Sequence, residues 1–135
     1  NIMDGLRLRQ TYMWSDFRFT DDPQYGDNSL PIVPEHFYRA ELRGSVGDFW
    51  IAPSVEWSMS DAWTDYANTF EAGSYAIFNL NLGYEFENGP MVFLDVRNIA
   101  NFTPVVNWNA ATVAQRNIFF PGDTRSLYAG VAFTF

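Results

Sequence analysis

The sequence predicts an all-β chain, in which an antiparallel meander of six strands crosses a membrane as part of a β-barrel. Apolar and polar residues alternate with a period of two in six segments, the pattern of strands with one apolar face. Short turns and long loops alternate between these segments, as in outer-membrane barrels. The last strand carries an apolar stripe that ends on Phe135, which is rare in soluble proteins because such an edge invites aggregation.

Composition agrees with a membrane barrel and excludes other classes. Aromatic residues make up 19% of the 135 residues, charged residues make up 18%, and cysteine is absent. The lack of cysteine excludes disulfide, thiolate and zinc-finger chemistry. A net charge of -8 argues against a nucleic-acid partner, which needs a basic patch. The mean hydropathy of -0.18 is compatible with strands that alternate, and no apolar run is long enough for a membrane helix.

The first predicted strand covers residues 6–19, with an apolar face that includes Trp14. Gln10 and Met13 break the alternation. After Ser15 the parity of the apolar residues reverses. Either a bulge lies at this point or the strand has left the membrane.

The second and third predicted strands, residues 37–46 and 49–59, form a hairpin around a Gly-Asp turn. A two-residue turn places the residues that flank it on the same face of the hairpin. Here these residues are Val46 and Phe49, and both are apolar. The turn chemistry and the assignment of the two faces therefore agree.

The remaining predicted strands are residues 75–87, residues 91–99 and the C-terminal segment 125–135. An Asn-Gly-Pro turn separates the first two of them. Leu80 lies on the apolar face of the first, and Phe93 lies on the polar side of the second as an exception. We expect the apolar faces of all these strands to be exposed on the surface of the chain.

The connections predict the orientation of the strands. Long connections near residues 20–36, 60–74 and 100–124 alternate with the two short turns. In outer-membrane barrels the long loops are extracellular and the short turns periplasmic, so a periplasmic C-terminus fits every connection. Aromatic residues then form an outer and an inner row, as in the girdles of such barrels. The outer row is Trp14, Tyr38 and Trp57, and the inner row is Phe49, Tyr84, Phe86 and Phe135.

Six strands are too few to close a membrane barrel, which needs about eight. Open edges in lipid would leave backbone groups unpaired, each at a cost of several kcal/mol. The chain also begins with Asn1 rather than Met, without a signal segment. We therefore expect residues 1–135 to be the end of a longer polypeptide rather than one part of a shared barrel.

Four segments carry a family resemblance through their order and spacing. They are Leu30–His36, Gly73–Tyr84, Val92–Asn101 and Phe120–Val131. With these segments the chain resembles the C-terminal part of a TonB-dependent outer-membrane receptor. The resemblance implies that residues 1–135 are the last six strands of a roughly 22-stranded barrel, and that the plug domain and the earlier strands are absent.

The resemblance also implies a function and partners. Such receptors import a scarce nutrient across the outer membrane of Gram-negative bacteria, often a ferric siderophore or another metal complex, with energy supplied through TonB. The implied partners are outer-membrane lipid and lipopolysaccharide, the rest of the receptor with its plug, TonB, the barrel assembly machinery and the metal-chelate ligand. No cofactor is implied. The sequence carries no catalytic motif, so we expect no enzyme.

Candidate functional residues lie in the long loops and at the C-terminus. Aromatic and arginine side chains in the loops suit an anionic, ring-bearing ligand, with loop packing as the alternative. These residues are Trp63, Tyr66, Trp108 and Arg116. The resemblance implies that the C-terminal strand is recognised by the barrel assembly machinery through Leu127, Val131, Phe133 and Phe135.

We expect structural roles, rather than ligand binding, for the polar residues of the junctions and strands. His36 is the only histidine, and without cysteine partners it predicts a loop–strand junction rather than a metal site. Cross-strand ion pairs are expected on the polar face. The residues concerned are Arg39, Glu41, Arg43 and Glu56.

Two further protein classes fit the pattern. One is another outer-membrane barrel, such as a porin-like channel, and the other is a soluble β-barrel binding domain with its apolar face inside.

Overall fold

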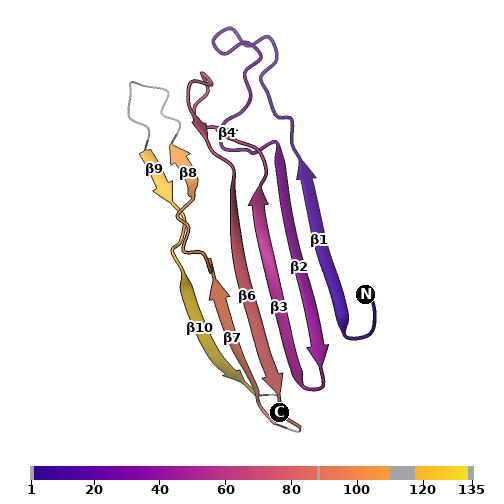
Figure 1. The fold of residues 1–135 in the computed structure, drawn as a ribbon. Coiled ribbons are helices and arrows are strands. Elements are labelled where there is room, and N and C mark those ends of the chain that lie inside the picture. The colour runs from indigo at the N-terminus through magenta and orange to yellow at the C-terminus, as the bar shows by residue number, and fades with distance from the viewer. Residues whose placement is uncertain (1, 88, 110–117, 134–135) are drawn as a thin grey trace.

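The computed structural model describes residues 2–87, 89–109 and 118–133 of the chain. Figure 1 shows six long strands side by side in one layer. These are β1 (Leu6–Trp14), β2 (His36–Val46), β3 (Phe49–Ser58), β6 (Tyr75–Glu85), β7 (Met91–Arg97) and β10 (Ser126–Ala132). They pair antiparallel in the order β1-β2-β3-β6-β7-β10, which confirms the predicted six-stranded meander.

Two small hairpins in the long connections were not predicted. They are β4 (Ala62–Trp63) with β5 (Glu71–Ala72), and β8 (Val105–Asn109) with β9 (Ile118–Pro121). Within the described part of the chain, no helix is long and apolar enough to span a membrane.

The first strand is shorter than predicted, because β1 ends at Trp14 and not at residue 19. The chain then folds on itself over residues 15–35, where the backbone amide of Leu30 donates to the carbonyl of Phe17 at 2.7 Å. Backbone groups that would continue the strand are therefore used inside the loop. The reversal of parity after Ser15 marks the end of the strand rather than a bulge.

The register aligns the apolar side chains of all six strands on one face. One row runs from Ile51 through Leu82 and Leu94 to Ala129. No second layer covers this face among the described residues. The one buried hydrophobic residue in the described part of the chain, Ala52, is 2% exposed and lies on the opposite, polar face. The predicted exposure of the apolar faces is thus confirmed. A soluble barrel with this face inside does not fit the structure.

Two exceptions to the alternation have local explanations. Gln10 lies on the apolar face, where its side-chain oxygen accepts a hydrogen bond from the hydroxyl of Tyr38 at 3.0 Å. Phe93 lies on the polar face opposite Gly130. A Cβ atom on this glycine would come within 2.5 Å of the Phe93 ring, so the ring occupies the space that the missing side chain leaves.

Aromatic residues form rows on the apolar face near both ends of the strands. Tyr12, Tyr38 and Trp57 are register partners next to the long connections. Phe49 pairs with Tyr84 next to the short turns. These rows match the predicted outer and inner girdles. Of the residues predicted for the inner row, Phe135 lies outside the described residues.

Asn98 closes the base of the third long connection, within the family-like segment Val92–Asn101. It is 3% exposed and has a positive φ of 51°, which asparagine tolerates better than most residues. Its amide nitrogen donates to the carbonyls of Phe102 and Asp123, and its backbone amide donates to the Asn79 side chain at 2.9 Å. One side chain therefore joins the two ends of the connection between β7 and β10.

Candidate ligand-binding loops and the polar face

The three long connections lie at one end of the sheet, and the two short turns lie at the other (Figure 1). This arrangement follows from the strand order, because consecutive antiparallel neighbours place alternate connections at opposite ends. The predicted alternation of loop lengths is therefore present in the structure. Loop residues that could contact a common ligand are brought to the same end.

The first and second long connections are hydrogen-bonded to each other. The side-chain nitrogen of Asn68 donates to the carbonyl of Ser29 at 3.0 Å, and the amide of Ser29 donates back to the Asn68 side-chain oxygen at 2.8 Å. The amide of Ile32 donates to the carbonyl of Trp63 at 2.8 Å. These hydrogen bonds hold the two loops against each other.

Three aromatic rings pack between these loops. Phe19 and Tyr25 come from the first connection and Tyr66 from the second. The ring centroids are 5.3 Å apart for Phe19–Tyr25, 5.9 Å for Phe19–Tyr66 and 5.6 Å for Tyr25–Tyr66. Such distances are typical of favourable aromatic contacts. Tyr66 therefore packs within the loops, and its contact with a ligand stays a prediction.

Asp65 organises the turn that carries Tyr66. Its carboxylate accepts hydrogen bonds from the amide of Thr69 at 2.9 Å, the hydroxyl of Thr69 at 2.7 Å and the amide of Phe70 at 3.2 Å. Burial alone raises the pKa of this carboxyl, but the hydrogen bonds outweigh it and the pKa lies below its usual value. The stabilisation is present above the usual pKa of aspartate and is lost as the pH falls through the lowered value.

The polar face carries the predicted ion pairs in part. Arg39 pairs with Glu56 across β2 and β3 at 3.0 Å, as expected. Glu41 lies 3.9 Å from Arg9 on the other neighbouring strand, β1. Arg43 is not in an ion pair among the described residues and instead stacks over the ring of Trp50 at 4.1 Å. Sequence reasoning missed this contact because it joins diagonal rather than directly opposed positions.

A hollow of about 470 Å³ lies on the polar face below the third long connection. Polar side chains line it, among them the acceptor Asp95 and the side chains of Asn79, Asn81, Thr124 and Tyr128, which can both donate and accept hydrogen bonds. The polar face therefore suits water or a polar partner. It contrasts with the apolar face, which presents aromatic and aliphatic side chains.

The family is decided by comparison with known sequences. The model of the family described as TonB dependent receptor-like, beta-barrel matches residues 3–99. The chain belongs to this family. No curated protein matches the sequence.

Three solved structures of receptors for siderophores or ferric chelates share the fold. The siderophore receptor PiuA from Acinetobacter baumannii is 16% identical over 98% of the chain, with a TM-score of 0.80. The ferric-catecholate import receptor Fiu from Escherichia coli is 18% identical over 99%, with a TM-score of 0.77. The ferric yersiniabactin uptake receptor FyuA from Yersinia pestis is 16% identical over 98%, with a TM-score of 0.80. The chain spans 20%, 19% and 22% of these proteins, respectively.

The structure places only some of the predicted ligand-binding residues of this receptor barrel. Trp63 is half-buried on β4, where its carbonyl joins the two loops. Trp108 lies on β8, but its side chain is not described, and Arg116 lies outside the described residues. The structure therefore brings Trp63 and Tyr66 into one loop and leaves their contact with a ligand as a prediction. The loop residues Phe19 and Asn68 were missed because only the folded loops show their partners.

The C-terminal strand of the receptor barrel presents its predicted apolar residues. Leu127, Val131 and Phe133 are 64%, 54% and 63% exposed. Within the six-stranded sheet β10 pairs only with β7. Phe135 lies outside the described residues. Recognition of these residues by the assembly machinery remains a prediction.

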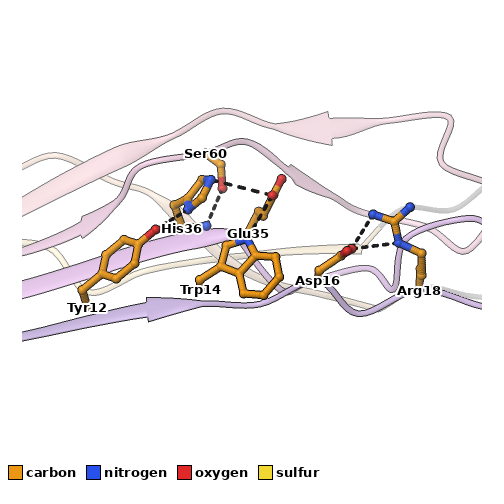
Figure 2. Close-up of polar contacts among 7 residues, drawn as sticks. All are labelled: Tyr12, Trp14, Asp16, Arg18, Glu35, His36 and Ser60. Atoms are coloured by element: carbon orange, nitrogen blue, oxygen red, sulfur yellow. Dashed lines mark hydrogen bonds and ion pairs between the residues drawn. The ribbon is translucent and has the colours of Figure 1, made fainter.

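His36 lies at the junction between the first long connection and β2, as predicted (Figure 2). The hydroxyl of Tyr12 is 2.7 Å from Nδ1 of His36, and the backbone amide of His36 donates to the Ser60 hydroxyl at 3.0 Å. Trp14 donates from its indole nitrogen to Glu35 at 3.2 Å. Among the described residues, no group of three histidine or acidic side chains could hold a metal ion. The hydrogen bonds of Tyr12, Trp14 and His36 hold the first long connection against the end of the sheet.

Proposed function

We propose that residues 1–135 form the C-terminal part of the barrel wall of a receptor in the outer membrane of a Gram-negative bacterium. In this proposal the intact receptor also has a plug domain and imports a ferric siderophore or a similar metal complex with energy from TonB. The observation that carries the proposal is the family match over residues 3–99, together with the shared fold of three receptors named for iron-chelate uptake.

The exposed apolar face supports a place in the membrane. A water-soluble protein rarely leaves so large an apolar surface open, whereas a barrel wall turns it toward lipid. Lipid and lipopolysaccharide would then contact the aromatic rows. We also propose that the barrel assembly machinery recognises the C-terminal segment, residues 125–135, through its apolar residues. They are Leu127, Val131, Phe133 and Phe135.

Ligand capture is assigned to the long loops. The hydrogen bonds between the first two loops provide a preformed surface, and aromatic or arginine side chains can stack on or pair with an anionic chelate. The proposed contacts are Trp63, Tyr66, Trp108 and Arg116. Of these, Trp63 is the best residue to replace, because its ring is not one of the three that pack between the loops. Those three rings belong to Phe19, Tyr25 and Tyr66.

The test is transport by the intact receptor in iron-starved cells. Cells that produce the receptor should accumulate ⁵⁵Fe supplied as a ferric catecholate or as ferric yersiniabactin, and cells that lack TonB should not. Trp63→Ala should weaken binding of the transported chelate by about tenfold, or about 1.4 kcal/mol. Trp57→Ala, on the apolar face, should leave binding unchanged. Uptake that does not need TonB would contradict the proposal and favour a passive porin-like channel.

A further inference from the structure

Arginine residues are concentrated on one part of the polar face. The chain has eight cationic residues and a net charge of -8. Four of the cations lie on the polar faces of the neighbouring strands β1 and β2. They are Arg7, Arg9, Arg39 and Arg43. An acidic chain thus presents one basic strip, and this strip lies inside the predicted barrel rather than on its lipid side.

Two of these arginines form ion pairs with glutamates of the sheet, and two do not. Arg9 and Arg39 pair with Glu41 and Glu56, at 3.9 Å and 3.0 Å. Arg7 and Arg43 are direct register partners, so two positive charges face each other across β1 and β2. Like charges in this position destabilise a sheet. Among the described residues neither of the two forms an ion pair.

The surroundings of the uncompensated pair are open. Arg7 and Arg43 line a hollow of about 500 Å³ together with Asp4, Gly5 and Ser45. The single carboxylate of Asp4 cannot balance both guanidinium groups. The guanidinium of Arg43 also stacks over the ring of Trp50, at 4.1 Å, which restricts its position. Its guanidinium is therefore positioned to accept a further anionic partner.

A second hollow of about 360 Å³ lies farther along the same strands. It is lined by Thr11, Ser54 and the two ion pairs Arg9–Glu41 and Arg39–Glu56, so its carboxylates are already paired. From Arg7 to Thr11 the strip extends about 13 Å along β1, at roughly 3.3 Å per residue. A single small anion would fill only one end of it. A short protein segment would fill its length and meet hydroxyl groups as well as charges.

We propose that the Arg7–Arg43 strip is a docking surface for an acidic protein segment that lies against the polar face of the barrel wall. The carboxylate of an aspartate or glutamate in this segment pairs with the two arginines. The inference rests on the proposed function, in which the plug domain lies inside the barrel. The receptors that share the fold are about five times as long as the chain, since it spans 20% of PiuA, so they contain ample polypeptide for such a segment.

Photo-crosslinking in the full-length receptor tests the docking surface. A photoreactive amino acid at Ser45, in the hollow, should crosslink to a peptide that contains Asp or Glu and lies outside residues 1–135. The same group at Thr11 provides a second position if the Ser45 variant fails to fold. Val46 is the matched control, because it is the next residue, faces the apolar side and is 84% exposed. It should give no such peptide.

Charge reversal tests the ion pair itself. Arg43→Glu should lower the thermal unfolding midpoint of the full-length receptor, and reversing the acidic residue found by crosslinking should restore it. Crosslinks from Ser45 and Thr11 only to a neighbouring wall strand, no crosslink at all, or no restoration would each overturn the docking surface. Iron uptake in the same receptor separates the two proposals. Crosslinks without uptake count against the function alone, and uptake without crosslinks counts against the docking surface alone.

Discussion

Replacing Leu80 with arginine in the intact receptor should lower the free energy of unfolding in a lipid bilayer by about 2–4 kcal/mol. Leu80 lies in the middle of β6, between its register partners Pro53 on β3 and Val96 on β7. Its side chain is therefore on the apolar face, far from both aromatic rows. A guanidinium group at this depth must leave water for hydrocarbon, and this transfer is the source of the loss. A denaturant titration of the receptor in vesicles measures it.

Asn81→Arg is the matched control for this prediction. Asn81 is the next residue on β6, faces the polar side and is the register partner of Asp95. An arginine there meets water and a carboxylate, so the loss should be much smaller. Equal losses for the two variants, or an unchanged unfolding free energy for Leu80→Arg, would contradict the assignment of the faces.

Replacing Gly83 with alanine should lower the free energy of unfolding by about 1–3 kcal/mol, the usual range for overpacking. A Cβ atom at Gly83 would lie 2.6 Å from the Trp50 ring and 2.7 Å from its indole nitrogen. The ring cannot easily move away, because Arg43 stacks on it at 4.1 Å. The same denaturant titration measures the loss.

Gly44→Ala is the control, since it adds the same methyl group to another strand glycine. The nearest atom to a Cβ there is a terminal carbon of Leu6 at 3.7 Å, which is an ordinary contact. The change should stay within about 0.5 kcal/mol. In a Trp50→Ala background the loss caused by Gly83→Ala should largely disappear. An undiminished loss in that background would show that backbone strain, rather than the ring, is responsible.

Trp50 and Gly83 also belong to a row that sequence reasoning did not find. The register aligns Trp50, Gly83, Phe93 and Gly130 across β3, β6, β7 and β10 on the polar face. Large rings therefore alternate with glycines, and each ring covers a neighbouring glycine. In the sequence Phe93 is only an exception to the alternation, because its partner Gly130 is far away along the chain.

The strands and their faces were predictable because a period of two needs only local information. Four of the six predicted strands begin within one residue of the observed start and end within two of the observed end; the exceptions are the first strand, which ends at Trp14, and the C-terminal strand, whose predicted last residue lies outside the described part. In the first strand the hydrogen bonds of the following loop override the pattern. Apolar residues such as Phe17 continue past that point but belong to the folded loop.

From the sequence, the long connections could be predicted as loops, but the contacts within and between them could not. Trp63 and Tyr66 were predicted from their chemistry, but the packing of Tyr66 against Phe19 and Tyr25 depends on residues more than 40 positions away. The reciprocal hydrogen bonds of Asn68 with Ser29 join two loops in the same way. No local pattern encodes such contacts, so the site could be placed at one end of the sheet but not assembled from the sequence.

The most direct test of the central claim, that the apolar face meets lipid, is the accessibility of spin labels on adjacent residues of β7. Residues 1–135 contain no cysteine, so a single cysteine at Leu94 or at Asp95 can carry the one nitroxide label in this part of the receptor. In the full receptor in bilayers, membrane-dissolved oxygen should relax the label at Leu94 strongly and the label at Asp95 weakly. Equal relaxation at both positions, or stronger relaxation at Asp95, would contradict the account.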